Sequence, residues 1–175
     1  MNWKKAFTLI EAIITMSIAV VVVAGVILAM TRGASNVQKG SFTMQACNQA
    51  AWISMWLRKD LTCARLAEVK MGTGASQWDG SNGNLEVPFL DKAAGKAVYE
   101  LKKLGNGKAL VRMVKGKERV LAREILHELK INRIAENDFK IEILMKDPAK
   151  HAKDFAWEGR IFPPCENSLA KYWKK

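Results

Sequence analysis

A long apolar segment near the N-terminus dominates the hydropathy pattern of this chain. Residues 12–30, AIITMSIAVVVVAGVILAM, contain no charged side chain, whereas most charged residues follow Arg32. At about 1.5 Å per helical residue this run is roughly 28 Å long, close to the hydrocarbon thickness of a bilayer. A buried helix of a soluble domain is rarely so long and so uniformly apolar. We therefore predict one membrane-spanning helix followed by a water-soluble body.

A second apolar pattern, with helical spacing, follows this segment. Residues 35–70 contain no proline, and apolar side chains recur three or four positions apart. This stripe consists of Ala50, Ile53, Leu57, Leu61 and Ala64. Trp52 and Trp56 lie beside the stripe, and we expect them to pack against a sheet, with a ligand or carbohydrate platform as the alternative. If this helix continues the membrane segment, it covers about residues 7–68.

The hydrophobic period changes to two beyond a glycine-rich loop at residues 71–84. Such alternation is typical of half-buried strands. The alternating segments lie near residues 97–101, 109–113, 119–125, 139–145 and 155–161. In the second of these, Ala109, Val111 and Met113 form the expected apolar face, and Arg112 falls on the opposite side. The pattern predicts about five or six short strands.

One helix followed by strands, without alternating helix and strand units, predicts an α+β fold with an antiparallel sheet. We expect the apolar face of the sheet to cover the helical stripe. The predicted organisation is a membrane and assembly helix at 7–31, an amphipathic helix of the head at 32–70, and an antiparallel β-rich head at 71–175.

Charge gives an orientation and a candidate partner. The chain has 28 Lys plus Arg against 17 Asp plus Glu, a formal charge of +11. Lys4 and Lys5 precede the apolar run and only Arg32 follows it closely, which favours a cytoplasmic N-terminus and an exported body. The positive surplus is compatible with anionic membrane lipid or DNA. Because the lysines are scattered, a solvated basic surface is favoured over nucleic-acid binding.

An acidic residue, Glu11, interrupts the apolar sequence near its start. A carboxylate in such a segment is costly and usually has a partner. In one interpretation Glu11 stays at the level of the lipid headgroups and pairs with Lys4 or Lys5. In the other, cleavage before Phe7 creates a positive α-amino group that neutralises Glu11 of a neighbouring copy. The carboxylate would then control assembly.

The string Lys5-Ala6-Phe7-Thr8-Leu9-Ile10-Glu11, followed by an apolar segment, resembles the class III signal of type IV pilins and pseudopilins. The resemblance implies a leader at 1–6, cleavage between Ala6 and Phe7 by a prepilin peptidase, and N-methylation of Phe7. It also implies a role for Glu11 in filament assembly. Ala6 stands where the family usually has glycine. Two alternatives stay open: a secretory signal cut after Ala24, and an uncleaved signal anchor.

The order of elements also resembles J-type minor pseudopilins of type II secretion and related minor pilins. The resemblance implies a pilin-like α+β fold and a single-pass protein of the bacterial inner membrane, with a cytoplasmic N-terminus and a periplasmic head. The implied partners are other pilin-like subunits in a fibre, the prepilin peptidase, the inner-membrane assembly platform and membrane lipid. A signal-anchored periplasmic binding domain and a DNA-binding competence minor pilin are the alternatives.

The remaining chemistry-bearing residues predict neither catalysis nor a cofactor. His127 and His151 lie outside any recognisable catalytic motif, and the loop at 79–84 lacks the acid spacing of a calcium site. We therefore expect no enzyme activity, no metal and no cofactor.

The chain has three cysteines, an odd and sparse set. Cys47 and Cys63 on one helix would lie roughly 24 Å apart, too far for a disulfide. Any disulfide within the chain must therefore use Cys165. Cys63 is the candidate partner that we name, and a chain without a disulfide is the alternative.

Overall fold

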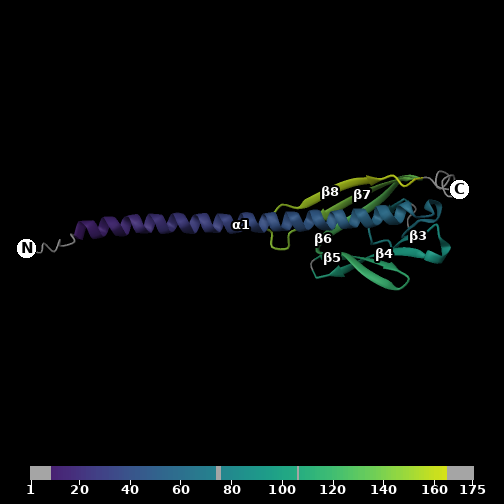
Figure 1. Ribbon diagram of the computed structural model, residues 1–175, viewed down its shortest axis with the longest axis horizontal. Coiled ribbons are helices and arrows are strands. Elements are labelled where there is room, and N and C mark those ends of the chain that lie inside the picture. Colours follow the sequence, from purple (N-terminus) through teal and green to yellow (C-terminus); the bar gives the residue numbers. More distant parts are fainter. Residues whose placement is uncertain (1–8, 74–75, 106, 165–175) are drawn as a thin grey trace, which may run out of the picture. The chain divides into compact units, whose positions relative to one another are not determined.

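A computed structural model describes residues 9–73, 76–105 and 107–164 of the chain (Figure 1). The chain divides into two compact units, residues 1–41 and residues 42–175. The long helix α1 (Leu9–Thr62) contributes to both of them. We describe each unit by itself and call residues 42–175 the head.

The head contains α1 from Phe42 onward, two short 3-10 helices and an antiparallel sheet. The 3-10 helices are η1 (Leu66–Glu68) and η2 (Lys92–Ala94). The strands are β1 (Lys70–Met71), β2 (Gln77–Trp78), β3 (Leu85–Pro88), β4 (Lys96–Leu104), β5 (Gly107–Val114), β6 (Lys117–Ala135), β7 (Asp138–Met145) and β8 (Phe155–Ile161). The expectation of five or six strands was therefore too low, since the described residues alone form eight.

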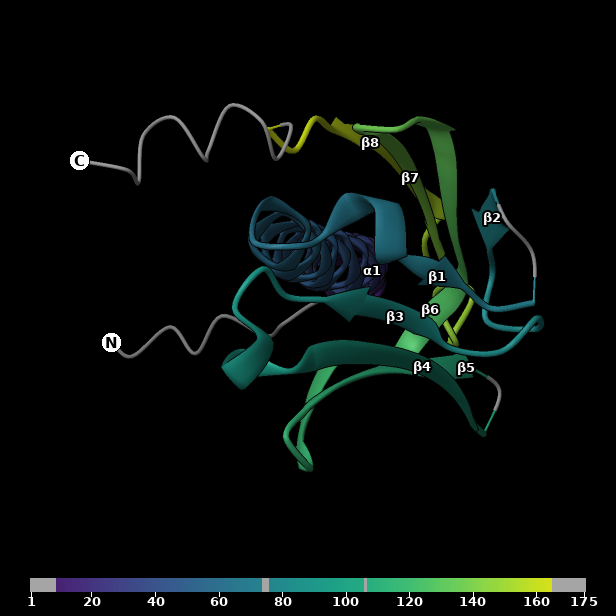
Figure 2. The same ribbon diagram turned by 90° about the vertical axis from the view of Figure 1, so that its right-hand side faces the viewer.

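The sheet runs in the order β1-β3-β4-β5-β6-β7-β8, and β2 pairs with β6. Strand β6 is the longest: its first half pairs with β5 and its second half with β7. Register shifts interrupt both pairings, and β-bulges of this kind bend and twist a strand. The bent β6 lets the sheet curl, so that β3 and β4 lie on one side of α1 and β7 and β8 on the other (Figure 2).

The concave face of this sheet buries one stripe of α1. The stripe starts at Phe42 and Ala46 and continues through the predicted positions Ala50, Ile53, Leu57 and Leu61. On the sheet, the alternating apolar residues of the predicted segment at 139–145 are buried as well: Phe139, Ile141, Ile143 and Met145. Helical and strand periodicity therefore identified the main packing surfaces correctly. The protein has an α+β fold with a pilin-like layout, in which an N-terminal helix packs with a C-terminal antiparallel sheet.

The helix ends earlier than the predicted boundary at Lys70. Helix α1 stops at Thr62, and the chain then pairs with the end of β3. The N–H of Arg65 donates to the carbonyl of Pro88 at 2.9 Å, and Ala64 forms an isolated bridge with Phe89. Contacts that are distant in sequence thus replace the next helical turn.

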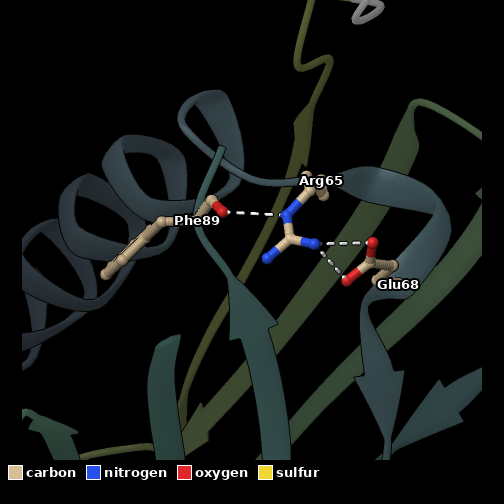
Figure 3. A network of polar contacts seen from close by, with 3 residues as sticks. All are labelled: Arg65, Glu68 and Phe89. Atoms are coloured by element: carbon tan, nitrogen blue, oxygen red, sulfur yellow. Dashed lines mark hydrogen bonds and ion pairs between the residues drawn. The ribbon is translucent and has the colours of Figure 1, made fainter. Parts of the chain in front are cut away.

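The side chain of Arg65 fixes this transition (Figure 3). Its Nε donates to the carbonyl oxygen of Phe89 at 3.0 Å, and its Nη1 lies 2.7 Å from both carboxylate oxygens of Glu68. One guanidinium therefore ties the chain after α1 to the segment after β3 and to η1. The helical composition of residues 63–70 could not reveal this, because the partner carbonyl comes from another part of the sequence.

Strand β5 presents the opposite face to the one expected. Leu110 belongs to the core under the sheet and Val114 packs against it, whereas Val111 is buried outside that core. Arg112 shares the inward face, because it pairs directly with the buried Tyr99 of β4. The prediction that Ala109, Val111 and Met113 face the helix was wrong, since it treated arginine as a marker of solvent.

Candidate functional site

The first described half of α1 presents an apolar surface. Its large side chains from Leu9 to Met30 are exposed: Leu9, Ile10, Ile13, Ile14, Met16, Ile18, Val20, Val21, Val22, Val23, Val26, Ile27, Leu28 and Met30. In length and composition this part of the helix could cross a membrane. A contiguous apolar surface of this size marks a membrane or protein contact.

Hydroxyl side chains within this segment bond to the helix backbone. The Oγ1 of Thr15 donates to the carbonyl of Glu11 at 2.7 Å, and the Oγ of Ser17 donates to that of Ile13 at 2.8 Å. The Oγ1 of Thr31 lies 3.0 Å from the carbonyl of Ile27. Because hydrocarbon offers no hydrogen bonds, such internal partners make these hydroxyls compatible with a membrane.

The sequence-predicted site residues are only partly described. Glu11 lies near the start of the described part of α1 and is exposed. Ala6 and Phe7, the predicted cleavage and methylation positions, lie outside the described residues. So does Cys165, and its pairing with Cys63 stays a prediction. Cys63 itself is exposed, and it forms no disulfide with another described residue.

A buried ionic network in the head joins α1 to the sheet. Asp60 of α1 is 2% exposed. Its Oδ2 accepts from the hydroxyl of Tyr99 at 2.6 Å and from Nε of Arg112 at 2.7 Å, and its Oδ1 accepts from Nη2 of Arg112 at 2.8 Å. The arginine contact is bidentate, which is the strong geometry for a carboxylate. Both oxygens of a costly buried charge are thus satisfied.

The network changes the proton affinity of its members. Burial raises the pKa of Tyr99 far above its usual value, and the charge of Asp60 raises it further. The hydrogen bond to Asp60 raises the pKa of Arg112 as well. Tyr99 therefore stays protonated and Arg112 stays charged across all physiological pH values. The network thus works as a fixed clamp between α1 and the sheet.

Trp56 of α1 lies among three cations. The distances from its ring centroid are 5.0 Å to Nζ of Lys59, 4.5 Å to Cζ of Arg112 and 4.8 Å to Cζ of Arg119. These separations are typical of cation–π contacts. Trp56 is half-buried and packs against the core, as predicted, whereas Trp52 is 51% exposed and does not. The sequence spacing placed both tryptophans beside the stripe but could not separate their roles.

An apolar cleft of about 710 Å³ lies beside this network. The end of α1 and the segment between β3 and β4 form its walls. The lining includes Lys59, Asp60, Cys63, Phe89, Leu90 and Arg112. Its volume is within the usual range for small-ligand pockets. The head therefore contains an apolar recess with charged groups at its margin.

Comparison with known proteins does not identify the chain. No family model, curated protein or solved structure matches it. The described residues also contain no group of three or more His, Cys, Asp and Glu side chains that could hold a metal ion. The candidate sites are thus the apolar surface with Glu11, and the charged network with its cleft.

Sequence reasoning missed the network altogether. Asp60 adjoins the apolar residue Leu61, and Arg112 alternates with apolar residues in β5. A signal was nevertheless present, because an acid at the edge of a buried stripe needs a buried partner. The sequence did not reveal that Arg112, among many basic residues, is that partner.

Proposed function

We propose that this protein is a minor pilin-like structural subunit. It is inserted in the membrane by the apolar half of α1, cut between Ala6 and Phe7 and methylated by a prepilin peptidase. It then joins other pilin-like subunits in a pseudopilus or type IV pilus. In this proposal it belongs to the bacterial inner membrane, and its head lies in the periplasm. The fibre serves protein secretion or pilus initiation.

The observation that carries the proposal is the apolar surface of residues 9–30 with a single carboxylate, Glu11, in a chain of pilin-like layout. A membrane anchor alone requires no acid. A helix that must pass from lipid into a bundle of similar helices has a use for one, because a charge in an apolar setting strongly favours the register that brings a counter-charge close.

The proposed assembly mechanism uses two kinds of contact between subunits. Apolar side chains from Leu9 to Met30 pack against the same helix of neighbouring subunits. This packing holds the helices together but does not fix their axial position relative to one another. The Glu11 carboxylate then pairs with the α-amino group of Phe7 on an adjacent subunit, which fixes the axial position. Cleavage is necessary for this pairing, because it creates the amine.

The direct test is the mass of the mature N-terminus in protein purified from native membranes. We expect a chain that begins at N-methylated Phe7. A chain that begins at Met1 or Gly25 would exclude this processing. It would support the second candidate, a signal-anchored periplasmic binding domain, which is favoured by the cleft of about 710 Å³ in the head.

A second test separates anchoring from assembly. Glu11→Gln removes the charge and keeps the size of the side chain, so we expect normal membrane insertion but at least about tenfold less co-assembly, from loss of one charge-assisted contact. Glu136→Gln, on the exposed β6–β7 turn of the head, is the matched control and should co-assemble normally. Equal cross-linking of both variants to other pilin-like subunits would exclude this role of Glu11.

A further inference from the structure

The cations around Trp56 outnumber the nearby acids. Arg112 is neutralised by Asp60 in a bidentate ion pair. Among the described residues, Lys59 and Arg119 form no salt bridge, although both are exposed and lie within about 5 Å of the same ring. The cluster therefore has two surplus positive charges in one place.

The register of the sheet shows where the uncompensated charge lies. Arg112 of β5 and Arg119 of β6 are direct cross-strand partners, so both project from the same face. Asp60 neutralises Arg112, so the positive charge that is left on this pair belongs to Arg119. The ring of Trp56 attracts the Arg119 cation but supplies no negative charge. An anion beside Arg119 would supply it.

A hydrogen-bond donor in the same cluster also lacks a partner. The indole Nε1 of Trp56 is buried and finds no acceptor among the described residues. Because this nitrogen has almost no solvent-accessible surface, an external ligand does not reach it, and the indication of a ligand comes from the cations. Lys59 has a second role, because it lies in the last turn of α1 and offsets the helix dipole. Arg119 has no such role, so its position is the sharper indication of a ligand.

The neighbouring cleft indicates which kind of molecule carries the anion. Lys59 and Arg112 line this cleft, whose other walls include Phe89, Leu90 and Cys63. A ligand that fits both parts has a carboxylate next to an apolar group. Nucleic acid would need a row of cations for successive phosphates, and the cluster offers only two that are unpaired.

We propose that Lys59 and Arg119, which lie beside the ring of Trp56, bind a carboxylate of a partner polypeptide, and that the cleft takes its apolar neighbour. The partner is a segment with an Asp or Glu beside a large aliphatic or aromatic residue. Such a site would recruit a protein to the head, which goes beyond co-assembly through the apolar helix. It does not depend on cleavage or on Glu11.

The test uses the full chain in detergent, with ¹⁵N-labelled tryptophan. Trp56→Phe identifies the indole signal of Trp56. The probe is acetyl-Leu-Asp-Leu-amide, and acetyl-Leu-Asn-Leu-amide is its uncharged match. We expect a saturable shift of the Trp56 signal with the aspartyl peptide, and about tenfold weaker binding of the asparaginyl peptide, from loss of a charge-assisted contact. Equal binding of both peptides, or no shift, would overturn the proposal.

Two variants separate the site from general basicity. Arg119→Gln should weaken binding of the aspartyl peptide about tenfold. Arg58→Gln removes an exposed cation from the same helix outside the cluster and should leave binding unchanged. Equal weakening by both variants would indicate non-specific attraction. A titration with inorganic phosphate forms the last arm: phosphate binding as tight as that of the peptide would exclude a role for the apolar cleft and overturn the assignment to a polypeptide.

Discussion

Asp60→Asn tests whether the buried ionic network holds α1 against the sheet. The substitution keeps the shape of the side chain but removes its charge and places an amide among donors. Asp60 accepts three hydrogen bonds, two from Arg112 and one from Tyr99. Asparagine has one acceptor oxygen, so at least one donor loses its partner. We expect a large loss of stability in the head.

The magnitude follows from burial. Removing one partner of a buried pair costs about 3–5 kcal/mol, because the other charge stays behind uncompensated. The Arg112 side chain is 13% exposed and can turn partly to water, so we expect about 3 kcal/mol for Asp60→Asn. Arg112→Gln should cost about 4 kcal/mol, since Asp60 is 2% exposed and cannot escape. Glu68→Gln breaks an exposed ion pair with Arg65 and should cost less than about 1 kcal/mol.

The assay is urea unfolding of the full chain in detergent, followed by tryptophan fluorescence. The loss of stability should be largest for Arg112→Gln, smaller for Asp60→Asn and smallest for Glu68→Gln, with equal dependence on urea. An apolar double replacement, Asp60→Leu with Arg112→Met, should recover most of the loss, because it leaves no buried charge. If Asp60→Asn costs no more than Glu68→Gln, the network does not clamp the helix.

Two further predictions concern the head. The pKa of Tyr99 is raised in the folded state, so its contribution to the free energy of unfolding is complete below pH 10 and declines above it, by about 1.4 kcal/mol per pH unit. Tyr99→Phe should remove this decline when urea unfolding is measured between pH 9 and 11. The same slope in Tyr99→Phe and in the unmodified chain would contradict this prediction. Gly107→Ala should cost about 2 kcal/mol, because a Cβ there collides with the backbone carbonyl of Glu124. Gly40→Ala, with open space around it, should be neutral or stabilising in the same urea titration, and equal losses for both variants would refute the collision.

The sequence predicted the layers of this fold because each layer has a simple hydrophobic period. The stripe from Ala50 to Leu61 repeats every three or four residues, and β7 alternates strictly, so both packing faces were identified correctly. The boundaries were less accurate where tertiary contacts decide them. The end of α1 depends on hydrogen bonds to residues 88–90. The second half of β6 was missed, since a register shift near Leu126 breaks the alternation.

The head network shows a limit of periodicity arguments that has a physical cause. A period assigns polar residues to solvent, and it fails when two polar residues satisfy each other inside. Asp60 and Arg112 are 52 positions apart, and their pairing depends on how the sheet curls over the helix. The same curl brings Arg119 to Trp56. A cation on this face of the sheet therefore needs a counter-charge: Asp60 provides it for Arg112, whereas the described residues form no salt bridge with Arg119. That difference is why Arg119→Gln, and not a variant of Arg112, decides whether the head binds an acidic partner.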